Sequence, residues 1–201
     1  MINELILASG NKGKIAEFQS LLSGLDIQVQ SMKEYPGIGE IVEDGTTFME
    51  NALKKARTVC NATGKPAMAD DSGLMVDYLD GAPGIYSARF AGEDHSDAAN
   101  NAKVLDLMKD VPEEQRGAQF FCAIALVLPD GREYCVEGLC RGVLLHTLQG
   151  EGGFGYDPLF YVPNLQKTFA ELSMDEKNAI SHRGMANKKA VELIQTLQKE
   201  V

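Results

Sequence analysis

INELILASGNKGKIAEFQSLLSGL, residues 2–25, reads as an apolar run, a short polar loop and an amphipathic stretch. The apolar run at 2–8 predicts a buried strand. Four apolar residues then recur at the spacing of one helix face: Ile15, Phe18, Leu22 and Leu25. This spacing predicts a helix, which Gly24 helps to end. A strand joined to a helix by a short glycine-containing loop opens a βα unit, so the stretch predicts an α/β fold.

The alternation of strands and helices continues through the rest of the chain. Thr47 and Glu50 form a capping-box pattern at the start of a second helix, which Gly64 and Pro66 end. The further predicted elements are, in order, strands at 67–70 and 74–78, a helix from about Ser96 to Met108, strands at 118–128, 133–145 and 159–162, and two helices separated near Ser181. Two of these strands are joined by Pro129-Asp130-Gly131, which predicts a hairpin. A hairpin inside an alternating chain predicts a mixed central sheet flanked by helices.

Length and composition are those of an ordinary globular chain. With 201 residues, 44% hydrophobic and 24% charged, the chain suits one domain, or two lobes around a single cleft. It contains no repeat, low-complexity tract or linker, so residues 1–201 are expected to form one domain. No segment approaches the roughly 20 apolar residues of a membrane span, and no signal-peptide pattern opens the chain. A cytoplasmic protein is expected.

The charge of the chain excludes one class of partner. Lys and Arg total 19 against 29 Asp and Glu, a net charge of −10, and no basic run is present that could follow a nucleic-acid backbone. A small anionic ligand is compatible if a divalent metal lies between its charge and the carboxylates of the protein. The cysteines form no C-x-x-C pair, which predicts reduced core side chains rather than ligands or nucleophiles: Cys60, Cys122, Cys135 and Cys140.

The loop inside the opening stretch has the composition of a phosphate-binding loop. It consists of Ser9, Gly10, Asn11, Lys12, Gly13 and Lys14. A Walker A motif needs a glycine six positions before its lysine and a Ser or Thr after it, but here these positions are Ala8 and Ile15. The loop is therefore not a Walker A motif. Two glycines and Lys14 at the positive end of a helix still predict an anion site, and the alternative is an ordinary turn between a strand and a helix.

Acidic residues elsewhere could supply the metal ligands that this loop lacks. Asp70 and Asp71 follow a predicted strand, the place where ligands bind in open α/β sheets. Adjacent side chains of an extended chain point in opposite directions, so both could act as ligands only if the chain bends, which Ser72 and Gly73 favour. The alternative is an Asp-rich turn that caps the sheet.

A second acidic site precedes the helix that begins near Thr47. Glu43 is either another carboxylate for a metal or a partner of the helix dipole. In the first case Lys54, two turns into the helix, is expected to face the phosphates.

Aromatic and basic residues late in the chain predict a surface for a flat ligand. The candidates are Phe154, Gly155, Tyr156, Asp157, Lys177, His182 and Arg183. Glycines let the backbone approach a ligand, and aromatic rings stack on bases. His182 and Arg183 both donate hydrogen bonds, which favours a base with carbonyl acceptors. The alternatives are a plain structural loop and, for the later residues, a helix start capped by Ser181.

These segments together resemble the inosine/xanthosine triphosphate pyrophosphatase family over essentially the whole chain. The resemblance rests on six ordered blocks: SGNKGK from Ser9, EDGTTFMENALKKA from Glu43, ADDSGL from Ala69, GAPGIYSARFAG from Gly81, GGFGYDP from Gly152 and EKNAISHRG from Glu176. Six blocks in one order are far more specific than any block alone. Ser9 stands where the family more often has Thr, which keeps the hydroxyl.

The resemblance implies an activity and an architecture. It implies a cleft between two α/β lobes, a homodimer and dependence on Mg²⁺. It also implies hydrolysis of ITP, dITP and XTP between the α and β phosphates, giving the nucleoside monophosphate and pyrophosphate, as a house-cleaning of the nucleotide pool.

The resemblance also implies roles for individual residues. Ser9 to Lys14 would hold the triphosphate, and Asp71 would accept a proton and, with Glu43, bind the metal. Asp70 and Asp71 are too close in sequence for these two roles to be divided between them. Ser72 and Lys177 would contact the substrate, and Phe154 to Asp157 with His182-Arg183 would enclose the base.

Two other functions are compatible with parts of the pattern. A purine-nucleotide sensor that binds without cleaving is the first, although such a binder has little need of carboxylates beside phosphate. A small kinase is the second, and the failed Walker pattern disfavours it.

Overall fold

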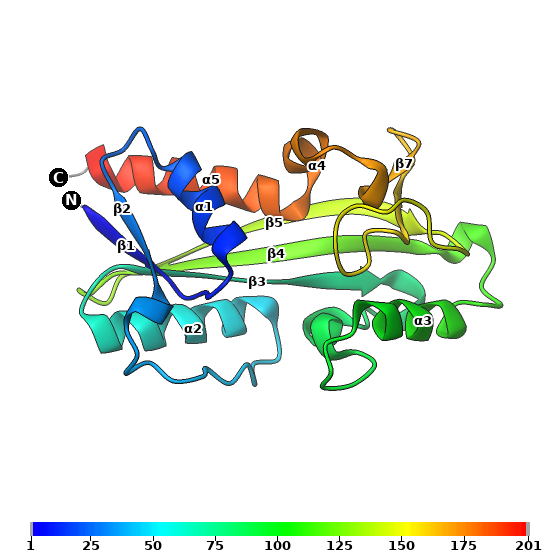
Figure 1. Cartoon of the computed structure of the whole chain (residues 1–201), viewed down its shortest axis with the longest axis horizontal. Helices are drawn as coiled ribbons and strands as arrows, with labels where there is room; N and C mark the ends of the chain where they lie inside the picture. Colours follow the sequence, from blue (N-terminus) through cyan, green and yellow to red (C-terminus); the bar gives the residue numbers. More distant parts are fainter. Residues whose placement is uncertain (1, 200–201) are drawn as a thin grey trace. The chain divides into compact units, whose positions relative to one another are not determined.

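The structure is a mixed sheet flanked by helices, as predicted (Figure 1). It is a computed structural model that describes residues 2–199, and within them the strand order is β2-β1-β3-β4-β5-β6-β7. The strands are β1 Glu4–Leu7, β2 Gln28–Ser31, β3 Ala67–Val76, β4 Gly117–Val127, β5 Glu133–Leu144, β6 Phe160–Val162 and β7 Lys167–Thr168. The α-helices are α1 Lys12–Leu21, α2 Phe48–Thr63, α3 Asp97–Leu107, α4 Met174–Ile180 and α5 His182–Lys199. β1 pairs parallel with β2 and β3, whereas β6 pairs antiparallel with β5 and β7.

The chain divides into two compact units, each assembled from separate segments. Unit 1 comprises residues 2–71, 123–137 and 186–199, and unit 2 comprises 72–122 and 138–185. None of the helices within residues 2–199 combines the length and apolar character needed to cross a bilayer.

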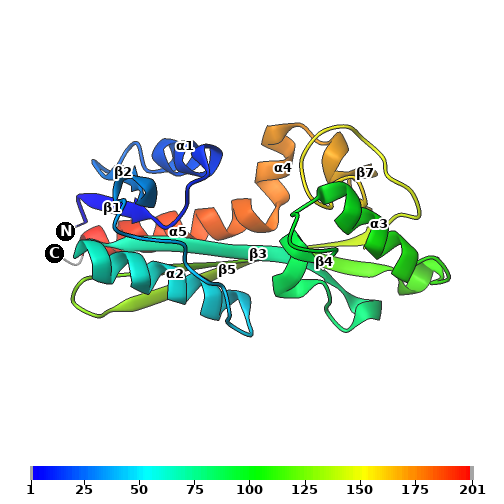
Figure 2. The ribbon, with the colours of Figure 1, turned by 60° about the horizontal axis from the view of Figure 1, so that its bottom comes forward.

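In unit 1 the first helices cover opposite faces of the sheet. The β1–α1–β2 connection moves away from β3, and the β2–α2–β3 connection moves back past β1. Both parallel crossovers are expected to be right-handed, so opposite directions place α1 and α2 on opposite faces. Figure 2 shows this arrangement, with α5 on the side of α1. Asn187 of α5 donates to Glu17 of α1 at 2.7 Å, which joins these two helices.

In unit 2 one face of the sheet packs on the core. The core residues on β3, β4 and β5 are Leu74, Val76, Ala118, Phe120, Cys140 and Leu144. Val104 and Met108, at α3, pack against them with the aromatic side chains of Phe160 and Phe169. The Phe120 and Phe160 rings are 4.7 Å apart between centroids. Burial of these rings stabilises unit 2.

β3 differs from its prediction, because one continuous strand replaces two strands and a bend. Gly73 remains extended because Ser87 lies against it: the Ser87 hydroxyl accepts from Leu74 N at 2.9 Å. A Cβ on Gly73 would lie 2.6 Å from the Gly84 carbonyl oxygen. The glycine therefore permits close approach of another segment rather than a turn.

Other predicted elements match, with differences at their ends. Thr47 caps α2 and Gly64 ends it in the left-handed conformation, as predicted. α1 ends at Leu21, so Leu22 and Leu25 follow the helix instead of belonging to it. The short strands β2 and β7 were not predicted from the sequence. Three cysteines are buried free thiols, but Cys135 is exposed, so the prediction of a core position is wrong for Cys135.

Candidate functional site

The loop from Ser9 to Lys14, called here the SGNKGK loop, satisfies much of its own backbone. Asn11 caps α1: its Oδ1 accepts from Gly13 N at 2.9 Å and from Lys14 N at 3.2 Å. Asn11 N donates to Ser9 Oγ at 3.1 Å. The amides of Asn11, Gly13 and Lys14 are therefore engaged within the loop.

Lys14 is held by a carboxylate of β3. Its Nζ donates to both oxygens of Asp70, at 2.8 and 2.7 Å, and the two side chains are 26% and 12% exposed. The ion pair joins the first turn of α1 to β3 and keeps the ammonium group of Lys14 beside Asp70. Asp70 is thus placed to orient Lys14.

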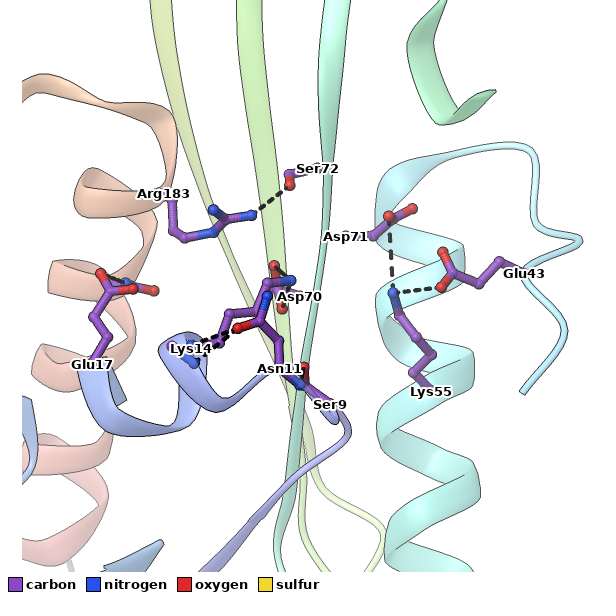
Figure 3. A network of polar contacts seen from close by, with 12 residues as sticks. Ser9, Asn11, Lys14, Glu17, Glu43, Lys55, Asp70, Asp71, Ser72 and Arg183 are labelled. Carbon is purple, nitrogen blue, oxygen red and sulfur yellow. Dashed lines mark hydrogen bonds and ion pairs between the residues drawn. The ribbon is translucent and has the colours of Figure 1, made fainter. Parts of the chain in front are cut away.

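Asp71 belongs to a different group of side chains, the carboxylate cluster, which comprises Glu43, Asn51, Lys55 and Asp71. Figure 3 shows Glu43 and Asp71 on either side of Lys55. Asn51 Nδ2 donates to Asp71 Oδ2 at 3.0 Å, and Asn51 Oδ1 accepts from Gly45 N at 2.8 Å. Lys55 Nζ lies 3.1 Å from Glu43 Oε1 and 3.9 Å from Asp71 Oδ1. Asn51 is fully buried, so it fixes the segment that carries Glu43 against α2 and Asp71.

The protonation of Asp71 is tuned toward neutral pH. Burial is the largest cause that raises the pKa of Asp71, the carboxylates of Glu43 and Asp70 act in the same direction, and the pKa lies at about 6. Lys55 and the hydrogen bond from Asn51 act in the opposite direction. A carboxylate with a pKa in this range can hold or release a proton near pH 7, as a general base requires.

The topology explains why Asp70 lies beside the SGNKGK loop. The chain reverses its winding direction between β1 and β3, and ligands of open α/β sheets bind at the carboxyl ends of strands at such a point. β1 pairs with β3 through Ala67 and Met68, so Asp70 lies beyond the end of β1, beside the SGNKGK loop.

Asp70 and Asp71 nevertheless face opposite sides of β3. The strand runs through both residues without a bend, so their side chains alternate: Asp70 reaches Lys14 of α1, and Asp71 reaches α2 (Figure 3). The bend that would have aimed both carboxylates at one ligand is absent from β3, and that prediction is wrong.

The carboxylate cluster suits a hard divalent cation. No group of three or more His, Cys, Asp and Glu side chains converges on a metal position within residues 2–199. Glu43 and Asp71, however, lie on one lysine and offer carboxylate oxygens, the ligand type that Mg²⁺ takes from proteins when substrate phosphates and water complete its shell. Their mutual repulsion, which raises the pKa of Asp71, is what a bound cation would relieve.

Lys55, and not the predicted Lys54, lies beside Glu43 and Asp71. Lys54 pairs with Asp44 at the surface, where the Asp44 side chain is 67% exposed. Lys55 was not selected from the sequence, although it stands four residues after Asn51 and thus on the same helix face. That spacing, read together with the buried Ala52 and Ala56, is the signal that could have found it.

In unit 2 the segment at 152–157, called here the aromatic loop, presents one ring to solvent. Phe154 is 60% exposed. Asp97 Oδ2 accepts from Gly155 N and Asn101 Nδ2 donates to Gly155 O, both at 2.7 Å. Phe154 N donates to Asp157 Oδ2 at 2.9 Å. The loop is therefore clamped through its backbone by the first turns of α3, a feature that the sequence analysis missed.

Two residues expected to touch a base are instead buried. Tyr156 is 4% exposed and its hydroxyl donates to the Ser87 carbonyl at 2.7 Å. His182 is 6% exposed and stacks on Phe120, with ring centroids 4.7 Å apart. Both side chains stabilise the core behind the aromatic loop, and neither offers a ring face to a ligand in this structure.

Basic side chains surround the exposed Phe154 ring. Lys177 Nζ lies 4.5 Å and Arg183 Cζ 5.7 Å from the ring centroid. Lys177 also pairs with the buried carboxylate of Asp157, and Arg183 Nη2 donates to Ser72 Oγ at 3.1 Å. Ser72, Phe154, Lys177 and Arg183 therefore lie together, and Asp157 serves as the anchor of Lys177.

Comparisons with known proteins agree with this architecture. A family model described as the Ham1 family matches residues 5–193. A protein of Desulforamulus reducens named dITP/XTP pyrophosphatase is 57% identical to the chain, over 96% of this chain and 96% of that protein. A protein of the same name from Geobacter sulfurreducens is 52% identical, over 92% of this chain and 93% of that protein. The solved Ham1 protein of Staphylococcus aureus is 41% identical with a TM-score of 0.91, over 96% of this chain and 98% of that one. The HAM1 protein of Coxiella burnetii is 42% identical with a TM-score of 0.92, over 98% and 100%. The chain belongs to the Ham1 family.

Proposed function

We propose that the protein is a pyrophosphohydrolase that converts ITP, dITP and XTP to the nucleoside monophosphate and pyrophosphate, in the cytoplasm. The observation that carries the proposal is the carboxylate cluster, in which a base with a pKa of about 6 stands with Lys55 and Glu43 at the winding reversal of the sheet. The names of the relatives from Desulforamulus reducens and Geobacter sulfurreducens support the same substrate class.

Asp71 acts as the proton acceptor in this proposal. Water attacks the phosphoanhydride, its proton passes to Asp71, the bond between the α and β phosphates breaks, and pyrophosphate leaves. Asn51 holds the carboxylate in position, and Lys55, which lies beside Glu43 and Asp71, is the cation there for phosphate oxygens. Asp70 contributes by orienting Lys14.

Glu43 and Asp71 would hold a divalent cation, for which we propose Mg²⁺. When bound, such an ion neutralises phosphate charge and favours departure of pyrophosphate.

The aromatic loop reads the base. Phe154 provides a stacking face, and Arg183, with Ser72, supplies donors toward the 6-keto oxygen that hypoxanthine and xanthine share. Adenine carries an amine donor at that position and would leave these donors unpaired, which disfavours ATP. Lys177 is held beside the base-binding residues by its ion pair with Asp157.

We also propose a homodimer, supported by an open sheet face in unit 2. Met75, Phe121 and Leu139 alternate with the core residues of β3, β4 and β5 and so lie on the other face. Leu139 is 46% exposed. A self-complementary apolar face is what a two-fold dimer buries. Light scattering of the purified protein should give twice the mass of the chain, and Leu139→Glu should lower it.

A substrate panel tests the activity. Incubation with ITP, dITP, XTP, GTP and ATP in Mg²⁺ should release pyrophosphate and the monophosphate from the first three. Release of orthophosphate and a diphosphate would contradict the assigned bond. Tight binding of the purine nucleotides without turnover in Mg²⁺ or Mn²⁺ would instead identify a nucleotide sensor.

A further inference from the structure

Lys33, from a segment outside the SGNKGK loop, lies over that loop. A Cβ placed on Gly10 would be 2.8 Å from Lys33 Nζ and would overlap the end of the lysine stem. The lysine occupies this position because residue 10 has no side chain. Gly10 thus provides space for a cation, a role distinct from backbone flexibility.

The backbone of Lys33 is fastened to the loop. Ser31 Oγ donates to the Ser9 carbonyl at 2.9 Å and accepts from Lys33 N at 3.2 Å. Ser31 N donates to Glu34 Oε1 at 3.0 Å, which completes a capping box. Ser31 is only 9% exposed, so the turn that carries Lys33 is fixed at its base.

The charge of Lys33 is not neutralised within the described chain. Neither an ion pair nor a hydrogen bond of its Nζ occurs with any of residues 2–199. Its neighbour Glu34 is committed to the capping box. Lys14, by contrast, is bound by both oxygens of Asp70, and the amides of Gly13 and Lys14 are capped by Asn11. Lys33 is therefore an available cation at this loop, in addition to the exposed Lys12 within it.

We propose that Lys33 contacts the phosphate chain of the substrate at the SGNKGK loop, in the space left by Gly10. The proposal rests on the proposed function for the identity of the substrate, but its physical content is recognition of a linear polyphosphate. Lys33 is an exposed side chain, so its replacement removes a charge without disturbing the core.

Inorganic triphosphate is the probe, because it has the phosphates without the base and its binding needs no turnover. Calorimetric titration with triphosphate in the presence of Mg²⁺ should show that Lys33→Met weakens triphosphate binding by about threefold to tenfold. This is the effect expected for one charge-assisted contact at a partly exposed site. Lys33→Arg should retain most of the affinity. Lys109→Met, which removes an exposed lysine of unit 2 paired with Asp106, is the matched control and should bind as the wild type does.

Gly10→Ala tests the geometry. It should weaken triphosphate binding in the wild type, because the new methyl group displaces Lys33, and should add nothing in a Lys33→Ala background. Equal effects of Gly10→Ala in both backgrounds would contradict the placement of Lys33. Wild-type affinity in Lys33→Met would overturn the proposal.

Steady-state kinetics then separate this proposal from the proposed function. Lys33→Met should raise the KM for dITP by the same factor as the triphosphate dissociation constant, with kcat within about twofold of wild type. An inactive wild type whose triphosphate binding still depends on Lys33 would refute the enzyme activity and support the contact. An active enzyme indifferent to Lys33→Met would do the reverse.

Discussion

The carboxylate cluster and the aromatic loop are held in place by opposite means. In the carboxylate cluster, charged side chains are crowded together, and burial and like charges raise the pKa of Asp71. In the aromatic loop, the backbone is clamped by Asp97 and Asn101, and the one buried carboxylate, Asp157, is fully engaged. In the carboxylate cluster the ionised form of Asp71 is therefore destabilised, whereas in the aromatic loop the polar groups have their hydrogen-bond and ion-pair partners. Variants of the first should therefore mainly change the rate, whereas variants of the second should mainly change stability and KM.

The largest expected effect is the loss of the base. Asp71→Asn should lower kcat for dITP by about a hundredfold or more, because removal of a general base costs roughly 10²–10⁴ in rate. Asp70→Asn should cost about tenfold, since it releases Lys14 without removing the base. Pyrophosphate release under saturating substrate measures both variants. A greater loss in Asp70→Asn would transfer the role of base to Asp70.

Breaking the anchor of the aromatic loop should have the next largest effect, on folding. Asp157→Asn leaves the half-buried ammonium of Lys177 unpaired and should lower the free energy of unfolding by about 3 kcal/mol. Urea denaturation at pH 7 measures the change. Asp106→Asn, which breaks the exposed pair with Lys109, is the control and should cost less than about 0.5 kcal/mol. Equal losses in the two variants would mean that the aromatic loop is not set by its buried pair.

The sequence predicts many of the elements that carry these two regions, because the spacing of apolar residues indicates burial and the capping and turn residues indicate where elements end. Strand β1, the capped start of α2 at Thr47 and the hairpin of β4 and β5 all follow from periodicity and caps. β2 was missed because its only strongly apolar residue is Val29, between Gln28 and Gln30, and its strand state is set by pairing with β1.

Contacts distant in sequence were not predictable in the same way. The sequence predicts a bend at Gly73, because a glycine after polar residues is typical of turns, yet it is the approach of Ser87 that requires the glycine. Tyr156 and His182 have the chemistry of ligand contacts, and only the fold shows that Ser87 and Phe120 occupy their faces. The sequence thus predicts which types of side chain gather in these segments, but not which way each side chain points.

The pH dependence of stability should expose the tension in the carboxylate cluster. The pKa of Asp71 is about 6 in the folded chain, against an ordinary value of 3.8 for an Asp side chain in the unfolded chain. The folded state therefore binds the proton of Asp71 more tightly than the unfolded state does. The contribution of Asp71 to stability is therefore greatest below about pH 4 and falls by about 2 to 3 kcal/mol as pH rises through 6. In EDTA, Asp71→Asn should be more stable than wild type at pH 7 and no more stable at pH 4. Added Mg²⁺ should narrow the gap at pH 7 by stabilising the wild type, because a metal that binds the folded state raises its stability. A less stable Asp71→Asn at pH 7 would show that Lys55 and Asn51 outweigh the burial.

The smallest expected effect decides whether the backbone clamp itself matters to the aromatic loop. Asp97→Ala removes the acceptor of Gly155 N and should cost about 1 kcal/mol of stability, the worth of one such hydrogen bond, and raise KM for dITP about two- to fivefold with kcat preserved. Asp97→Asn keeps an acceptor oxygen and should restore most of the KM. KM should depend on the clamp because a Phe154 ring held in place before binding does not lose conformational freedom when the base stacks on it. If Asp97→Ala lowers stability but leaves KM unchanged, the clamp serves folding alone, and Phe154 is positioned instead by Lys177 and Arg183 over its face.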